Sequence, residues 1–176
     1  MLVTLPGSPN EVGPLTAVVS GGVVQRIVFG SGFPPAESPA SLPDDPGGAA
    51  QDTHGSSGQE WDVADHLCTE IGAYSAGTLR SFSVPVDLGD VDTFARRVYS
   101  ALLTVGYGHT VTYGQLADMA GRPGAARAVG NTMATNPWPI LVPCHRVLPV
   151  SGGPGSYAGG AAAKSWLLAL EAQPAP

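Results

Sequence analysis

Two kinds of feature are scarce in this sequence, cysteines and long apolar runs. Its 176 residues include two cysteines, Cys68 and Cys144, which lie far apart and form no CxxC pair. Neither a disulfide framework nor a four-ligand zinc site is predicted, and we expect no metal and no cofactor. No run approaches the roughly 20 apolar residues of a membrane span, and the first residues lack the pattern of a secretory signal. We expect a monomer in the cytoplasm with no membrane partner.

Basic residues are also few, and they are unevenly distributed. The formal net charge of −6 argues at first sight against nucleic acid, because DNA binding depends on neutralising phosphates. Residues 1–90 carry two arginines against eleven acidic residues, net −9, whereas residues 91–176 carry five arginines and one lysine against three acidic residues, net +3. This asymmetry points to DNA on the C-terminal half, bound modestly and in a salt-sensitive way.

The first half of the chain has the pattern of a small α/β unit. Two β-rich runs, 15–20 and 23–29, are separated by two glycines and predict a hairpin. Residues 31–58 contain few large apolar side chains, so we predict a mobile, disordered surface loop. Apolar residues at helical spacing predict an amphipathic helix at about 59–75, and residues 82–86 predict a short edge strand.

From residue 87 onwards the pattern is mainly helical, which predicts two domains, 1–86 and 87–176. Asp92 is placed to cap a first helix, and Thr112 to cap a second at 113–120. A turn containing glycine leads into an alanine-rich helix that reaches about Thr135. A last helix is predicted at about 164–172.

The second and third of these helices form a helix-turn-helix pattern, in which the second helix normally lies in a DNA groove. Ordinary core helices give the same pattern, so this signal alone does not decide. Glycine and alanine make the second helix nearly smooth, and Arg127 is its single long cation. Arg127 would either insert into the DNA stack or remain a solvated charge. The lack of polar base-reading side chains argues against a transcription regulator.

Residues 140–147 form the most informative stretch, a β-prone apolar run that ends at Pro143 and places Cys144 beside His145. A thiol is a good nucleophile only as the thiolate, and a nearby imidazole or arginine can lower its pKa. A lone cysteine here could also be a small buried apolar residue. Together with a carboxylate, Cys144 and His145 would suit a cysteine hydrolase or an alkyl acceptor, and these residues alone do not discriminate.

Motifs in one order along the chain resemble the O6-alkylguanine-DNA alkyltransferases over about residues 82–171. Around PCHRV at 143–147 stand TYGQLA at 112–117, AARAVGN at 125–131, NP at 136–137, SYAGG at 156–160 and KSWLLALE at 164–171. The resemblance implies a DNA repair enzyme that flips a damaged guanine out of the duplex and transfers its alkyl group irreversibly to its own cysteine, once per chain. The expected partner is double-stranded DNA with O6-alkylguanine, and O4-alkylthymine is left open as a second lesion.

The resemblance also implies roles for individual residues. Cys144 would accept the alkyl group, His145 would act as a base through a water molecule, and Glu171 would orient His145. Tyr113 would support flipping and donate a proton to the guanine. We expect the pair of His145 and Glu171 to lower the pKa of Cys144.

Further residues are expected at the DNA and around the pocket. Arg127 would fill the gap left in the DNA stack, and Asn136 would brace the turn that carries Cys144. The remaining candidates are Ala126, Gly130 and Thr112 at the DNA, Met133, Pro139 and Trp138 in the apolar lining, and Tyr157, Ala158 and Gly159 in the pocket wall.

The implied fold is an α/β N-terminal domain, with a small antiparallel sheet plus a helix, followed by a mainly α, winged helix-turn-helix-like C-terminal domain. The alternative function is a non-catalytic protein that binds alkylated DNA. Relatives of that type replace the cysteine, which is present here.

Overall fold

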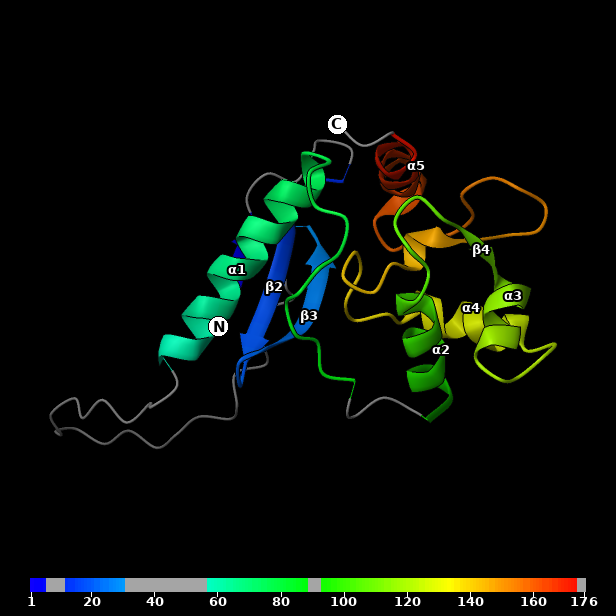
Figure 1. The fold of residues 1–176 in the computed structure, drawn as a ribbon, viewed down its shortest axis with the longest axis horizontal. Helices are drawn as coiled ribbons and strands as arrows, with labels where there is room; N and C mark the ends of the chain where they lie inside the picture. Colours follow the sequence, from blue (N-terminus) through cyan, green and yellow to red (C-terminus); the bar gives the residue numbers. More distant parts are fainter. Residues whose placement is uncertain (6–11, 31–56, 89–92, 174–176) are drawn as a thin grey trace, which may run out of the picture.

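The computed structural model describes residues 1–5, 12–30, 57–88 and 93–173 (Figure 1). Two predictions therefore fall on residues outside these ranges. The predicted loop at 31–58 lies outside them except for residues 57 and 58, which instead begin a helix. Asp92, the predicted cap of the first C-terminal helix, also lies outside the described residues.

A three-stranded antiparallel sheet and one helix form a unit that we call the N-terminal layer. The sheet has the order β1 (Leu2–Leu5), β2 (Leu15–Ser20), β3 (Val23–Phe29). The predicted hairpin is confirmed as β2 and β3, and Gly21 and Gly22 form its turn with φ angles of 62° and 74°. Glycine reaches such angles without steric cost. The sequence analysis missed β1, which pairs Leu5 with Leu15.

Helix α1 (Ser57–Ser75) packs on this sheet, as Figure 1 shows. Its buried side chains, Ala64, Leu67, Ile71 and Tyr74, recur every three or four residues, which confirms the predicted amphipathic helix. Each large one contributes about 1.5–3 kcal/mol by leaving water. The predicted edge strand at 82–86 is wrong, because only Val86 there bridges a strand residue, Val24.

The C-terminal part is built from helices α2 (Thr93–Leu103), α3 (Tyr113–Met119) and α4 (Ala126–Ala134), with α3 packed against both others. The predicted cap of α3 is confirmed. Thr112 Oγ1 accepts from the Gln115 amide at 3.2 Å, and the Gln115 side chain accepts from the Thr112 amide at 2.7 Å. This reciprocal capping box fixes where α3 begins, and therefore where Tyr113 points.

The chain between α4 and the last helix contains little regular structure. A short 3-10 helix, η1 (Cys144–Arg146), is followed by β5 (Val147–Leu148), which pairs in parallel with β4 (Val111–Thr112). Helix α5 (Gly160–Glu171) begins four residues before the predicted start.

Residues 140–143 form no strand, although their composition favours one. Ile140 has a φ of 76°, the single positive value at a non-glycine residue among those described. Such an angle costs a β-branched residue about 1–3 kcal/mol. The surrounding fold must therefore hold this turn in place directly before Cys144.

The N-terminal layer contacts the C-terminal part along β3. The Ile27 amide donates to Pro137 O at 2.7 Å, and Trp138 Nε1 donates to Val24 O at 2.7 Å. The Phe29 ring packs edge to face on Tyr157 at 5.4 Å between centroids. The layer thus holds both the segment before Cys144 and the loop after it.

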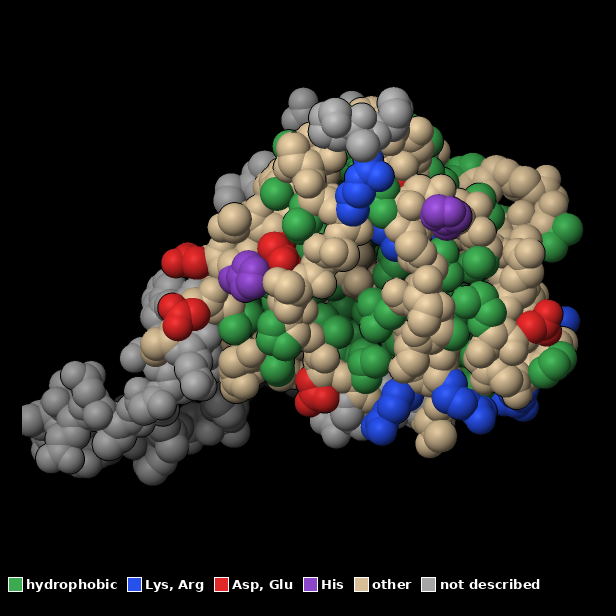
Figure 2. All heavy atoms as spheres, in the orientation of Figure 1, with side chains coloured by type: hydrophobic (Ala, Val, Ile, Leu, Met, Phe, Trp, Pro, Cys, Tyr) green, Lys and Arg blue, Asp and Glu red, His purple; other side chains and the backbone are tan. Residues whose placement is uncertain are grey.

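Charged side chains are segregated on the surface. In Figure 2, acidic side chains lie over α1, and several arginines gather along the lower edge near α2 and α3. Arg97 and Arg122 both lie against the Phe94 ring, at 5.8 and 5.2 Å from its centroid. No helix in the described ranges is long and apolar enough to cross a membrane.

Candidate active site

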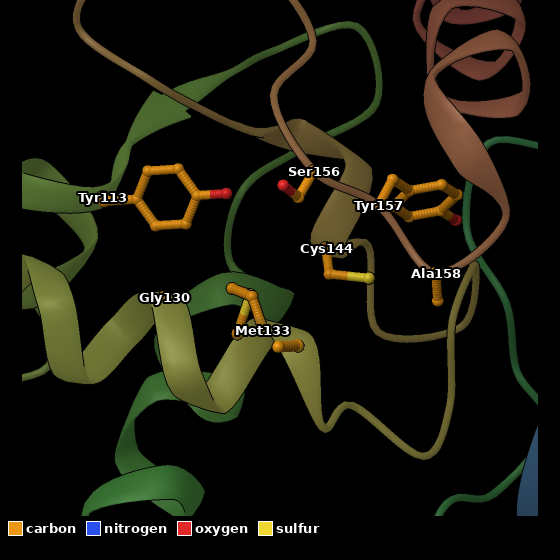
Figure 3. Close-up of a pocket in the computed structure, with 8 residues that line it drawn as sticks. Tyr113, Gly130, Met133, Cys144, Ser156, Tyr157 and Ala158 are labelled. Atoms are coloured by element: carbon orange, nitrogen blue, oxygen red, sulfur yellow. The ribbon is translucent and has the colours of Figure 1, made fainter.

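A cavity of about 250 Å³ lies over the amino end of η1, and Cys144 forms part of its wall (Figure 3). Every residue that lines it belongs to the C-terminal part: Tyr113, Gly130, Met133, Ala134, Cys144, Ser156, Tyr157 and Ala158. Small and apolar side chains form much of the wall, and hydroxyl groups of Tyr113 and Ser156 face each other across it (Figure 3). The cavity therefore suits a small, mainly apolar group with a few polar edges.

Cys144 is buried, with 6% of its surface exposed, and its turn is braced by Asn136. The Asn136 side chain donates to Val142 O at 2.9 Å and accepts from the Trp138 amide at 3.0 Å. Asn136 thus closes the turn from both sides, as the sequence analysis expected of it. This bracing fixes the thiol against the cavity although no strand supports it.

The expected lowering of the pKa of Cys144 is wrong for this structure. Burial raises the pKa of the thiol above its ordinary value, and the opposing effects of Asn136 and Lys164 are smaller. The pair of His145 and Glu171 does not counter this effect, because burial keeps His145 neutral and its Nε2–H is bound to Glu171. Arg146 is bound to Glu171 as well, so its charge is also not directed at the sulfur. At neutral pH Cys144 is therefore a thiol, and its proton must be removed during the reaction.

His145 is completely buried and bound to Glu171, with 3.0 Å between Nε2 and Oε1. A carboxylate can only accept, so Nε2 carries the ring proton, and Nδ1 of the neutral ring is left as an acceptor. Nδ1 is buried without a partner among the described residues. Burial also lowers the pKa of His145, and the bond to Glu171 only partly offsets this. His145 is neutral at pH 7 and is able to take a proton at Nδ1.

Glu171 is held by five hydrogen bonds. Oε1 accepts from Tyr74, Arg146 and His145 at 2.6, 2.8 and 3.0 Å. Oε2 accepts from Arg146 Nε at 2.9 Å and from the Gly108 amide at 3.1 Å. Burial disfavours its charge, but the bonds from His145 and Arg146 outweigh burial and hold the pKa of the carboxyl far below its usual range. Glu171 is thus a fixed anion that orients His145.

The other predicted pocket residues divide into two groups. Tyr113, Met133, Tyr157 and Ala158 line the cavity as expected, and Ser156 and Ala134 join them without having been predicted as lining. Burial raises the pKa of Tyr113, so its hydroxyl stays a proton donor.

Three predicted residues do not line the cavity, because each lies behind it and packs against other parts of the fold. Trp138 packs edge to face on Tyr99 and hydrogen-bonds to β3. Pro139 is buried and bridges Val142. Gly159 faces Phe29, where an added Cβ would lie 2.7 Å from the ring.

The predicted DNA residues lie on α3 and α4. Arg127 is exposed at the start of α4 and borders a shallow groove with Arg122 and the small residues Gly124, Ala125 and Ala128. Ala126 is half-buried, and Gly130, which was predicted at the DNA, lines the cavity. The Thr112 side chain is used as the cap of α3. A basic, smooth surface therefore leads directly to the pocket.

Two polar side chains at this site were given no role by the sequence analysis, although Lys164 begins the KSWLLALE motif. Lys164 is 1% exposed, and its ammonium group donates to Val147 O at 2.7 Å. Tyr74 reaches Glu171 from α1. Each lies on the buried face of its helix, Tyr74 on α1 and Lys164 on α5. The sequence alone does not reveal that their polar ends point inward. No group of three or more potential metal ligands occurs within the described ranges.

Comparison with known proteins gives concordant results. Residues 93–173 match the family described as 6-O-methylguanine DNA methyltransferase, DNA binding domain. A methylated-DNA–protein-cysteine methyltransferase of Mycobacterium tuberculosis is 50% identical over 107 residues, which are 61% of this chain and 64% of the relative's length.

Two solved structures of Mycobacterium tuberculosis proteins extend the likeness to the whole chain. The O6-methylguanine methyltransferase has a TM-score of 0.76 at 37% identity, with 100% of this chain and 96% of the other covered. The structure of OGT in complex with DNA has a TM-score of 0.74 at 36% identity, with 97% and 92% covered.

Proposed function

Because the chain belongs to the O6-methylguanine-DNA methyltransferase family, we propose that it repairs DNA by moving an alkyl group from O6-alkylguanine to its own Cys144. The observation that carries this proposal is the junction of the cavity, with Cys144 in its wall, and the smooth basic surface of α4. A base reaches such a pocket only after leaving the stack, so the substrate enters as a flipped nucleotide.

The chemistry follows from the groups present. His145 Nδ1 takes the thiol proton of Cys144 through a water molecule while the sulfur attacks the alkyl carbon. A C–S bond forms and the bond between that carbon and guanine O6 breaks. The guanine leaves with the electron pair and receives a proton from Tyr113, which then recovers one from solvent. Glu171 stabilises the His145 imidazolium and does not itself take up the proton.

The product is a thioether, whose C–S bond offers water no good leaving group. Cys68 lies on α1 in the N-terminal layer, where burial and Asp65 raise the pKa of its thiol. It does not line the cavity. Each chain therefore acts once.

On the DNA side, α3 and α4 act as a helix-turn-helix, and the loop at 149–159 flanks α4 as the wing. Arg127 fills the stack, and Ala126, Gly130 and Thr112 lie against the backbone. O4-alkylthymine stays a second candidate lesion. The proposal also includes two domains, 1–86 and 87–176. We further propose a monomer that resides in the reducing cytoplasm.

A radiolabelled methyl group on O6-methylguanine in a duplex provides the test. The label is expected to move to the wild-type protein and to stay on the DNA with Cys144→Ser, because a neutral hydroxyl is a poor nucleophile toward an sp³ carbon. Cys144→Ser should still bind the duplex. Binding of alkylated DNA without transfer by a well-folded wild type would instead support the non-catalytic alternative.

A further inference from the structure

The N-terminal layer sends one polar group into the buried pair of His145 and Glu171. Tyr74, 1% exposed on the last turn of α1, donates from its hydroxyl to Glu171 Oε1 at 2.6 Å. The same hydroxyl lies 3.4 Å from His145 Nε2. Tyr74 therefore touches both members of the pair, although 97 residues separate it from Glu171.

The position of this hydroxyl is set by the packing of its ring. The ring stacks edge to face on Tyr107 at 6.0 Å and at a tilt on Phe82 at 5.1 Å. Ala64, Leu67 and Ile71 bury the same stripe of α1 against the sheet, so the helix cannot rotate without exposing them. In Figure 1 the last turn of α1 lies at the end of the layer that approaches α5. The donor is therefore presented by a rigid element.

The hydroxyl has one fixed role in this environment. Burial, together with the neighbouring carboxylate, keeps the pKa of Tyr74 well above its ordinary value, so the phenol stays protonated. Nε2 of His145 carries its own proton and cannot accept, which leaves Glu171 as the acceptor of Tyr74. Oε1 of Glu171 therefore accepts three hydrogen bonds, from the Tyr74 hydroxyl, from Arg146 and from the His145 N–H.

We propose that Tyr74 is a positioning residue for the alkyl transfer reaction, through which the N-terminal layer sets the orientation and basicity of His145. This inference rests on the proposed function for its effect on rate. Because the Tyr74 hydroxyl also binds Oε1, less of the negative charge of Glu171 acts on His145. The same hydrogen bond fixes the position of Oε1 and therefore the orientation of the imidazole that donates to it. The other charged and titratable groups near the pair are Arg146 of η1, Lys164 of α5, and Tyr107, Tyr157 and Cys144.

Tyr74→Phe removes the hydroxyl and keeps the ring. Without this donor more of the charge of Glu171 acts on His145, so the pKa of His145 rises and the acid limb of the rate profile moves to higher pH. At saturating methylated duplex and neutral pH the transfer rate should fall about tenfold, as for the loss of one hydrogen bond to a charged group. The dissociation constant for DNA should stay the same.

Tyr99→Phe is the matched control, because Tyr99 is equally buried and donates to Thr132 O, away from Glu171. It should lower stability through the loss of one buried hydrogen bond and leave the pH profile in place. If Tyr74→Phe changed only stability, with rate and acid limb equal to those of Tyr99→Phe, the positioning role would be overturned.

A second readout separates this inference from the proposed function. The pKa of His145 is measured by NMR titration of the full-length protein labelled at histidine, with His145→Gln to assign the signal. A higher pKa in Tyr74→Phe supports the inference even if the wild type transfers no alkyl group. An unchanged pKa overturns it even if transfer is observed.

Discussion

The two parts of the molecule contribute to the site in different ways. The C-terminal part supplies every residue of the cavity wall, and the family match at 93–173 is confined to it. The N-terminal layer supplies none of the wall, yet it holds the supports of the wall. Tyr74 binds Glu171, Val24 binds Trp138, and Phe29 packs on Tyr157. The comparison teaches that the C-terminal part carries the reacting groups and their nearest supports, and that the N-terminal layer adds a second set of contacts behind them.

Glu171→Ala should have the largest effect on stability. It leaves Arg146 and the Tyr74 hydroxyl buried without their acceptor, which costs about 3–5 kcal/mol. Glu70→Ala is the matched change in the N-terminal layer, where Glu70 accepts from the amides of Ser83 and Val84. Loss of those bonds costs about 1–3 kcal/mol. Urea denaturation measures both, and equal losses would remove the distinction between the two parts.

Arg127→Ala tests whether the start of α4, in the C-terminal part, acts on duplex DNA. Repair of duplex DNA should fall about 30-fold, because the arginine offsets an unstacking cost of a few kcal/mol. Reaction with free O6-methylguanine needs no unstacking and should be unchanged. Arg97→Ala, exposed on α2, serves as the control and should alter duplex repair little. Equal losses on duplex and free base would argue against insertion.

The pH dependence should report His145 rather than the thiolate. Because the pKa of His145 lies below 6.5, the transfer rate should be flat from about pH 7 to 8 and fall about tenfold per unit once pH drops below that pKa. Stability should change with pH in the same direction. Burial keeps His145 neutral in the folded protein, so stability is lost as the pH falls and an unfolded histidine becomes protonated. His145→Gln should abolish the acid limb. A rate that rises steadily through pH 9 would indicate that free thiolate controls the reaction.

The smallest effect is expected where Phe29 of the N-terminal layer packs against Gly159, behind the pocket. An added methyl in Gly159→Ala would meet the Phe29 ring at 2.7 Å, so the ring must shift at a cost of about 1 kcal/mol. Phe29→Leu in the same chain should relieve most of this cost. Thermal unfolding of the two single variants and the double variant gives the coupling. Additive effects would show that this contact does not link the two parts.

The same division explains what the sequence could predict. The hairpin, α1 and the cap of α3 follow from local patterns, which are visible in a few consecutive residues. Tyr74 at Glu171 and Trp138 at β3 depend on contacts between distant segments, so no local pattern announces them. The turn at Ile140 opposes its own composition, because Asn136 and the surrounding core hold it. The raised pKa of Cys144 is not predictable from its neighbours in the sequence, because it depends on burial by distant segments.

The central claim, that Cys144 alone takes one alkyl group and keeps it, is tested most directly by mass spectrometry after incubation with an excess of methylated duplex. The intact protein should gain the mass of one methyl group and no more. Peptide mapping should place that mass on the peptide with Cys144 and leave the peptide with Cys68 unmodified. More than one group per chain, continued repair after saturation, or a modified Cys68 with an unmodified Cys144 would contradict the account.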